Sequence, residues 1–216
     1  MNEHVTKQMN EWAGDFGKEY TDRNVCTLSE MEAYYKNRYG VSRTDMNDSF
    51  IGSFDKNIRI LEVGTNVGTQ LLCLQRAGFK NLYGIELQTY AIELAKIGTK
   101  EIDMVQGSAF NIPFQDDFFD LVFTSGVLIH ISPEDIIKVQ DEMYRCAKQY
   151  IWGFEYYSDK YMQVKYREEE DLLWKADFSD LFLERFNDLE LTKIEYFKYR
   201  ESDNVDAMFL LEKRTK

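Results

Sequence analysis

The sequence predicts an α/β fold with a mostly parallel seven-stranded sheet, helices on both faces and an antiparallel hairpin at the C-terminal end. Through the middle of the chain, short apolar runs alternate with amphipathic helical stretches. Strands that alternate with helices form parallel sheets with right-handed crossovers. Two later strand-like runs flank the polar segment 201–204, which indicates a hairpin.

The strands are predicted from short apolar runs bounded by turn residues. In chain order they are Ile58–Val63, Leu82–Glu86, Ile102–Gln106, Phe119–Ser125, Tyr150–Phe154, Leu191–Tyr199 and Val205–Lys213. The last two form the predicted hairpin, so the sheet ends in an antiparallel pair.

Three helices are predicted between these strands. Thr69–Ala77 carries apolar residues at helical spacing and ends before a glycine, and Gln88–Ile97 repeats this pattern. A third helix is expected to begin at Ser132 and Pro133, a serine cap with a proline in the first turn. It is expected to run to about Lys148.

A chain of 216 residues is most simply a single domain with a substantial core. Residues 1–55 read as a helical N-terminal cover that packs on the rest. Residues 56–216 read as the core of the fold, with an insertion near 156–176 before the last helix.

The formal net charge of −12 disfavours a nucleic-acid substrate, because binding a phosphate backbone requires a basic surface. No apolar run is long enough for a membrane helix, and the N-terminal residues lack an export-type apolar stretch. The three cysteines form no CxxC pair. We therefore expect a cytoplasmic protein that has no nucleic-acid or membrane partner and no structural zinc site.

The glycine loop after the first strand is the strongest candidate for a ligand site. Ligands of open parallel sheets bind beyond the carboxyl ends of the strands. Gly64 allows a sharp turn and close approach of a ligand, Asn66 tolerates a left-handed backbone, and Gly68 permits close packing at the start of the next helix. A dinucleotide fingerprint GxGxxG would also need glycines at positions 66 and 69, which are Asn66 and Thr69.

The spacing ExGxNxG is similar to the loop that class I S-adenosylmethionine-dependent methyltransferases place against the amino acid part of their cofactor. Glu86 closes the second strand about 20 residues further on, where a carboxylate can accept both ribose hydroxyls. A glutamate at a strand end can also be a solvated charge. The loop before it favours the binding role.

The remaining cofactor contacts are expected at the other strand ends and in the cover. Ser108 follows the third strand, where adenine should lie, and Ser125 and Gly126 follow the fourth. Tyr20 and Arg23 are expected to close over the methionine carboxylate, which an arginine fits well. The complete predicted set is Tyr20, Arg23, Glu62, Gly64, Thr65, Asn66, Gly68, Glu86, Leu87, Ser108, Ala109, Ser125 and Gly126.

Residues 55 to 213 resemble the class I methyltransferases, and particularly the small methylases associated with pseudaminic acid biosynthesis. The segments that carry this resemblance are LEVGTNVG, YGIELQ, QGSAFNIPF, FFDLVFTSGVLIHI and YIWGFEYY. The resemblance implies a Rossmann-like fold, S-adenosyl-L-methionine as cofactor, and an acceptor from the biosynthesis of nine-carbon surface sugars. The chain departs from this group at 166–169, where the relatives are expected to carry residues like Tyr-Arg-Gly-His.

The candidate catalytic residues are His130, Glu155 and Tyr156, which leave neighbouring strands at the same sheet edge. His130 is either a general base or a core or capping histidine. Glu155 and Tyr156 either contact a polar acceptor, with Glu155 as an alternative base, or belong to an aromatic wall over the cofactor. All three are expected to line one cavity. Arg167 and Trp174 lie in the insertion, where acceptor selectivity is expected, and no metal site is predicted.

The leading functional prediction is a methyltransferase that modifies a hydroxyl or amine of a small polar molecule, such as a sugar or sugar nucleotide. A catalytically silent S-adenosylmethionine-binding module that acts through partners is the alternative. A nicotinamide-dependent oxidoreductase is opposed by the failed GxGxxG spacing and by the terminal hairpin. The sequence does not indicate an oligomeric state.

Overall fold

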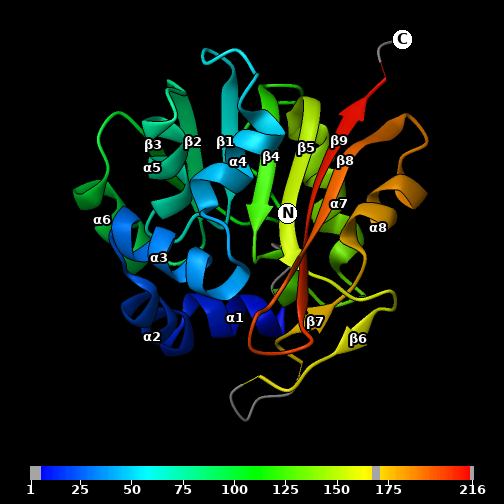
Figure 1. The fold of residues 1–216 in the computed structure, drawn as a ribbon, viewed down its shortest axis with the longest axis horizontal. Coiled ribbons are helices and arrows are strands. Elements are labelled where there is room, and N and C mark those ends of the chain that lie inside the picture. The colour runs from blue at the N-terminus through cyan, green and yellow to red at the C-terminus, as the bar shows by residue number, and fades with distance from the viewer. Residues whose placement is uncertain (1–5, 167–170, 215–216) are drawn as a thin grey trace.

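A computed structural model describes residues 6–166 and 171–214 of the chain. Its main sheet has seven strands in the order β3-β2-β1-β4-β5-β9-β8, which can be followed from left to right in Figure 1. The predicted fold class is confirmed: the first five strands are parallel, and the last two form an antiparallel pair. The strands of the main sheet are β1 (Arg59–Val63), β2 (Asn81–Glu86), β3 (Asp103–Gln106), β4 (Phe119–Ser125), β5 (Ala147–Tyr156), β8 (Leu189–Lys198) and β9 (Val205–Lys213).

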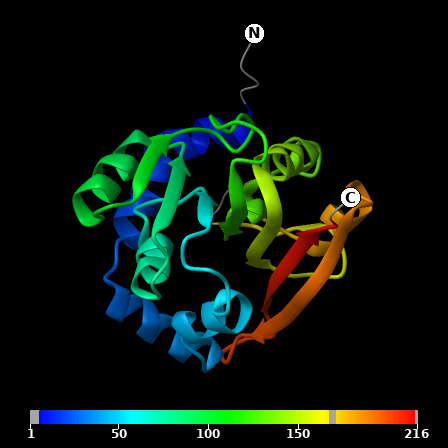
Figure 2. The ribbon, with the colours of Figure 1, turned by 90° about the horizontal axis from the view of Figure 1, so that it is seen from above.

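The central strands are apolar on both faces because helices cover both. Ile60, Leu61 and Val63 of β1 are completely buried. One face packs against α4 (Arg43–Ile51), α5 (Thr69–Arg76) and α6 (Thr89–Gly98), and the other against α7 (Ile136–Cys146) and α8 (Phe178–Arg185). Figure 2 looks along the sheet and shows it twisting between these two groups of helices.

The hairpin does not simply extend the sheet outward. Its second strand, β9, pairs with β5 and lies between β5 and β8. In this register Tyr156 is opposite Asp206, so the start of β9 lies beside the carboxyl end of β5.

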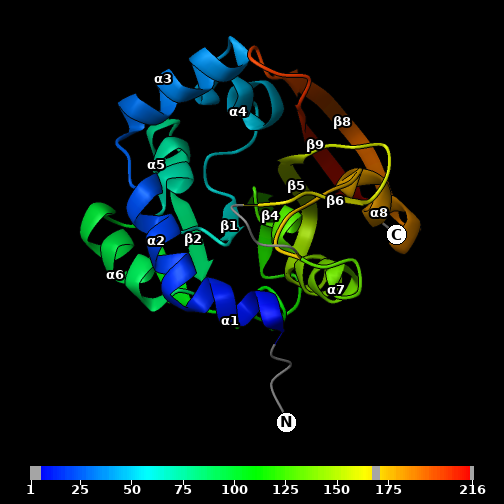
Figure 3. The same cartoon turned by 90° about the horizontal axis from the view of Figure 1, so that it is seen from below.

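The N-terminal residues form helices that lie across the carboxyl edge of the sheet, as seen from below in Figure 3. They are α1 (Lys7–Ala13), α2 (Asp15–Asn24) and α3 (Leu28–Tyr39), followed by α4. α3 begins with a capping box in which Thr27 and Glu30 satisfy each other's backbone N–H groups, and it ends at Gly40 in a left-handed conformation. We call α1 to α3 the cover.

The helix after the fourth strand differs from the prediction at both ends. α7 begins at Ile136, because Ser132–Asp135 form a turn in which the Asp135 N–H donates to the Ser132 carbonyl at 3.0 Å. It ends at Cys146, because Ala147 is already extended and pairs with Phe119 of β4. The strand predicted as Tyr150–Phe154 is correspondingly longer at both ends.

Between β5 and α8 the chain makes a small separate hairpin. Its strands are β6 (Met162–Gln163) and β7 (Trp174–Lys175), which pair antiparallel. Within the described ranges, none of the helices has the length and apolarity needed to cross a bilayer.

Candidate functional site

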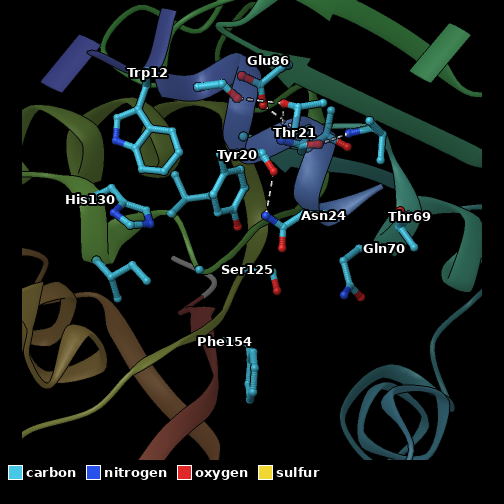
Figure 4. Close-up of a pocket in the computed structure, with 18 of the residues that line it drawn as sticks. Trp12, Tyr20, Thr21, Asn24, Thr69, Gln70, Glu86, Ser125, His130 and Phe154 are labelled. Carbon is cyan, nitrogen blue, oxygen red and sulfur yellow. Dashed lines mark hydrogen bonds between the residues drawn. The ribbon is translucent and has the colours of Figure 1, made fainter. Parts of the chain in front are cut away.

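A cavity of about 1030 Å³ lies between the carboxyl edge of the sheet and the cover. The loops after β1, β3 and β4 and the ends of β2 and β5 form its floor, and the cover contributes the opposite wall. Figure 4 shows side chains from both parts converging on this space, among them Tyr20 and Thr21 of α2 and Glu86 of β2. The site therefore occupies the position expected for a ligand of an open parallel sheet.

The glycine loop takes the backbone conformation that its residues predict. Gly64 has φ of 73°, and a Cβ placed there would lie 2.7 Å from Cγ2 of Val127. Asn66 has φ of 48°, which confirms its left-handed conformation. The backbone N–H groups of Gly64 and Thr65 both donate to the Ile85 carbonyl, at 2.9 and 3.0 Å, and so fix the loop to β2.

Glu62 anchors the loop from below. Its carboxylate is almost completely buried and accepts a hydrogen bond from the Thr65 hydroxyl at 2.7 Å. Burial raises the pKa of Glu62 to about 8, against the opposing effects of the Thr65 hydrogen bond and the positive charge of Arg43. Because its partner is a residue of the loop, Glu62 supports the loop's shape as well as contributing to the cavity wall.

Glu86 is held on both sides by backbone groups. One carboxylate oxygen accepts the Asn66 N–H at 2.8 Å and the other accepts the Gln88 N–H at 2.9 Å. Burial raises its pKa, although these backbone hydrogen bonds oppose the shift. Each oxygen can accept a further hydrogen bond, so the carboxylate is fixed and can still receive two hydroxyl donors from the cavity.

The other predicted cofactor contacts lie on the cavity wall, with one exception. The predicted residues on the wall are Tyr20, Arg23, Glu62, Gly64, Thr65, Asn66, Glu86, Leu87, Ser108, Ala109, Ser125 and Gly126. Gly68 is instead at the start of α5 with φ of 78°, and a Cβ there would lie 2.5 Å from Cε of Met104. Its role is close packing between α5 and β3.

Side-chain hydrogen bonds that the sequence did not indicate attach the cover to the loops after β1 and β2. Asn66 Nδ2 donates to the Thr21 hydroxyl at 3.1 Å. Gln88 Nε2 donates to the carbonyls of Ala13 and Gly14, both at 3.0 Å. The cover is therefore held by two residues that themselves lie on the cavity wall.

His130 lies on the wall in a short 3-10 turn after β4. Its Nδ1 is 2.6 Å from the Leu172 carbonyl oxygen, and its ring centroid is 4.4 Å from that of Trp12 (Figure 4). A carbonyl only accepts, so Nδ1 carries the proton and Nε2 of the neutral ring is an acceptor. Burial lowers the pKa of His130 to about 4, so the ring is neutral at pH 7.

Glu155 does not lie on the wall. Its buried carboxylate accepts hydrogen bonds from the backbone N–H groups of Val127, at 3.2 Å, and Ile129, at 3.4 Å. Burial raises the pKa of Glu155 to about 7. The expectation that all three candidate catalytic residues line one cavity therefore holds for His130 and Tyr156 but not for Glu155, whose observed contacts support the loop after β4.

Tyr156 lies on the wall, and its ring is parallel to that of Tyr199 at a centroid distance of 5.9 Å. The insertion that follows contributes Val164, Lys165, Tyr166 and Leu173 to the wall. The two insertion residues expected to affect acceptor selectivity are not among them. Trp174 is buried in β7 and does not line the cavity, and Arg167 lies outside the described residues. Within the described ranges there is no group of three His, Cys, Asp or Glu residues able to hold a metal ion.

Several wall residues were missed by the sequence analysis. They are Trp12, Arg38, Tyr39, Tyr199 and Asp206, among others. They come from the cover and the terminal hairpin, which lie far apart in the chain, and none belongs to a motif of fixed spacing. Packing of α3 on the hairpin brings the last four together, whereas Trp12 of α1 packs against His130.

Comparison with known proteins places the central segment in an enzyme class. Residues 61–150 match a family described as a methyltransferase domain. An uncharacterized protein of Haemophilus influenzae is 26% identical over 103 residues. That alignment covers 45% of this chain and 41% of the Haemophilus protein, so the chain spans less than half of that relative's length.

Solved structures share the fold over most of the chain. A Leishmania major S-adenosylmethionine-dependent methyltransferase has a TM-score of 0.70 at 17% identity, covering 96% of this chain and 87% of that chain. One from Methanosarcina mazei has a TM-score of 0.62 at 15% identity, covering 76% and 95%. A complex between the Haloferax volcanii Trm112 methyltransferase activator and a methyltransferase matches with a TM-score of 0.70 at 13% identity, covering 94% and 98%.

The structural matches establish the fold, and the domain match covers the strands and loops that build the cavity floor from β1 to the start of β5. Residues 61–150 are thus similar to methyltransferase domains, and structures that share the fold of the whole chain include S-adenosylmethionine-dependent methyltransferases.

Proposed function

We propose that the protein transfers a methyl group from S-adenosylmethionine to a hydroxyl or amine of a small polar molecule. The sequence resemblance to methylases of pseudaminic acid biosynthesis suggests a sugar or sugar nucleotide of nonulosonic acid synthesis as the acceptor. The observation that carries the proposal is the single cavity, which joins the glycine loop and Glu86 to a polar and aromatic wall beneath the cover. A small acceptor bound there would share one enclosed space with the cofactor.

The residues present fit this cofactor. Glu86 would hold the two ribose hydroxyls, because both of its oxygens keep acceptor capacity while backbone bonds fix their position. Gly64 and Gly126 present backbone without side chains at the floor, both with positive φ. Tyr20 and Arg23 would cover the methionine end, with Arg23 also within 3.5 Å of Glu19.

When bound, the cofactor supplies an electrophilic methyl group, and the chain has to align the acceptor and exclude water. The cover performs the second task, since its hydrogen bonds to Asn66 and Gln88 keep it closed over the floor. His130 would take the proton of an acceptor hydroxyl at Nε2, because Nδ1 is already committed to the Leu172 carbonyl. The neutral state of its ring is a requirement for that role.

We do not favour a catalytically silent binding module. Its cofactor site would need only the loop and Glu86, whereas this cavity continues past them to a neutral histidine and further polar side chains. For partners, we propose a small-molecule acceptor. The net charge of −12 gives no basis for a nucleic-acid acceptor.

The proposed function is tested by incubating the protein with radiolabelled S-adenosylmethionine and separate pools of sugars, sugar nucleotides, amines and carboxylic acids. We expect label in a hydroxyl- or amine-bearing pool, and loss of that label in His130→Ala. Cofactor binding without label in any pool would support the silent module instead.

A further inference from the structure

A second polar group lines the cavity wall, formed where the cover meets the terminal hairpin. We call Arg38 and Tyr39 of α3, Tyr199 after β8 and Asp206 of β9 the Asp206 cluster. The two segments are joined by a backbone hydrogen bond from the Arg200 N–H to the Arg38 carbonyl at 2.9 Å. None of these residues belongs to the glycine loop or to the strand ends that face the cofactor.

The carboxylate of Asp206 is fixed by two phenols. The Tyr39 hydroxyl donates to Oδ2, and the Tyr199 hydroxyl donates to Oδ1 at 3.2 Å. Asp206 is 6% exposed, yet it lines the cavity. Each oxygen therefore has one protein donor and can accept one more, and two adjacent acceptors held in this way match two neighbouring hydroxyl groups of a ligand.

Arg38 supplies a donor beside this acceptor. Its guanidinium lies 3.8 Å from the centroid of the Tyr199 ring, and its Nε is buried without a hydrogen-bond partner among the described residues. Arg38 also lines the cavity, and a guanidinium carries five N–H groups, so it can donate to a ligand oxygen as well. The cluster thus presents two acceptor oxygens from Asp206 and a donor from Arg38.

Aromatic rings surround the cluster on this wall. Tyr156 stacks parallel to Tyr199, and Phe154 lies on the same wall and is drawn at the lower side of the cavity in Figure 4. The ring of Tyr199 also carries Arg38 at 3.8 Å and that of Tyr156 carries Lys175 Nζ at 3.8 Å, so the rings are held in place. Aromatic surface beside a few fixed polar groups suits a ligand ring with apolar parts and a polar rim.

The charges around the cluster decide between hydroxyl and amine ligands. The positive charges of Arg38 and the completely buried Arg43 both act on Asp206, and Arg43 lies 4.6 Å from the Phe154 ring centroid. Two guanidinium groups oppose one carboxylate, so a ligand ammonium would meet net repulsion here. Neutral hydroxyl groups meet no such penalty.

We infer that the Asp206 cluster is the acceptor-recognition site and that it binds a sugar ring through adjacent hydroxyl groups. This inference rests on the proposed methyl transfer and makes a hydroxyl the methylated group. Asp206 accepts from two ligand hydroxyls, Arg38 donates to a ligand oxygen, and the aromatic side chains of Phe154 and Tyr156 on the same wall contact the apolar part of the sugar ring.

Ligand-observed NMR tests the inference with protein saturated with S-adenosylhomocysteine. The probes are N-acetylglucosamine and N-acetylneuraminic acid, with phenylethylamine as a cationic aromatic probe. We expect binding of at least one sugar in preference to the amine. Asp206→Asn keeps the shape of the side chain but replaces one acceptor oxygen with a donor, and we expect it to weaken sugar binding at least ~10-fold. Tyr199→Phe removes one of the two phenols that fix Asp206, and we expect it to weaken sugar binding by a smaller factor.

The matched control is Tyr196→Phe, since Tyr196 lies on β8 three residues before Tyr199, is 47% exposed and does not line the cavity. Thermal melts check that each variant folds, and calorimetry checks S-adenosylhomocysteine affinity. The inference is overturned if neither sugar binds, if the amine binds more tightly, or if both Asp206→Asn and Tyr199→Phe keep wild-type sugar affinity. Failure of wild-type protein to bind S-adenosylhomocysteine would instead count against the proposed function.

Discussion

Glu86 is the residue on which cofactor affinity should depend most clearly. Glu86→Ala removes two charge-assisted hydrogen bonds to a ligand, each worth roughly 1.5–3 kcal/mol. We therefore expect the affinity for S-adenosylhomocysteine to fall by at least ~10-fold. Isothermal calorimetry measures the change, and Glu93→Ala, at an exposed position on α6, serves as the control. An unchanged dissociation constant in folded Glu86→Ala protein would reject the ribose role.

The His130→Ala variant distinguishes a catalytic role of His130 from a packing role. If it is the general base, His130→Ala lowers turnover by ~10²–10⁴-fold with cofactor affinity nearly unchanged. Because burial lowers its pKa to about 4, wild-type turnover should not titrate through this group between pH 6 and 8. Single-turnover rates with labelled cofactor provide the measurement. Preserved turnover per folded molecule, with a stability loss of ~1–3 kcal/mol, would assign it to packing alone.

At the scale of elements, the hydrogen bonds that attach the cover to the loops after β1 and β2 should limit how often the cover opens. Gln88→Ala removes the donor to the carbonyls of Ala13 and Gly14. We expect amide hydrogen exchange across α1 and α2 to become about tenfold faster, since a lost side-chain bond contributes roughly 1 kcal/mol or more to closure.

Gln75→Ala is the matched control, because Gln75 Nε2 donates to the Lys100 carbonyl at 2.7 Å, away from the cover. Gln88 also caps α6 through the Tyr90 N–H, so faster exchange in the first turn of α6 alone is not the predicted result. Unchanged exchange in α1 and α2 would show that other contacts hold the cover.

The loop after β4 depends on Glu155, and this dependence should change with pH. The folded pKa of Glu155 is raised to about 7 from an ordinary value of 4.5. Between these pH values Glu155 is ionised in the unfolded chain but still protonated in the folded chain. The free energy of unfolding therefore falls as the pH rises from 4.5 to 7, and the contribution of Glu155 is constant above that pH. Glu155→Gln lacks this effect.

We therefore expect Glu155→Gln to gain stability relative to wild type between pH 5 and pH 8, by up to about 3 kcal/mol. Urea unfolding at both pH values measures the difference, with Glu184→Gln at an exposed position of α8 as the control. A difference that stays constant across this range, or reverses, would contradict the prediction.

The elements that were predicted well are those whose signals are local. β4 and β9 match their predicted bounds, because apolar runs ended by polar turns define them without reference to the rest of the chain. The start of α7 was missed because Ser132 and Pro133 form a good cap in isolation, whereas the chain first makes a turn there. The glycine loop was predictable for the same local reason as the strands.

The wall formed by the cover and the hairpin was not predictable in this way. Tyr39 and Asp206 are 167 residues apart, and their contact depends on how the cover packs against the hairpin. Glu155 was misplaced because alternation along β5 does not specify that the loop after β4 folds back over its carboxylate.

At the scale of the whole molecule, ligand binding should raise the free energy of unfolding. S-adenosylhomocysteine at 100 times its dissociation constant should raise the free energy of unfolding by about 2.7 kcal/mol, and NAD at the same concentration should have no effect. Thermal shift measurements compare the two ligands. Gly64→Val should lose the shift, because a branched residue cannot adopt φ of 73° where a Cβ would lie 2.7 Å from Val127. A shift with NAD would contradict the cofactor assignment.

The position of β9 between β5 and β8 also affects how the chain matures during synthesis. A ribosome releases the glycine loop, Glu86 and β5 long before β9, so a nascent chain can complete the half of the sheet that carries the glycine loop and Glu86 while the edge of β5 is still unpaired. An open apolar edge of this kind is prone to wrong pairing. Arrival of β9 then covers that edge and brings Asp206 to Tyr39 in the same event. Protection from aggregation and completion of the Asp206 cluster are thereby linked to one late strand.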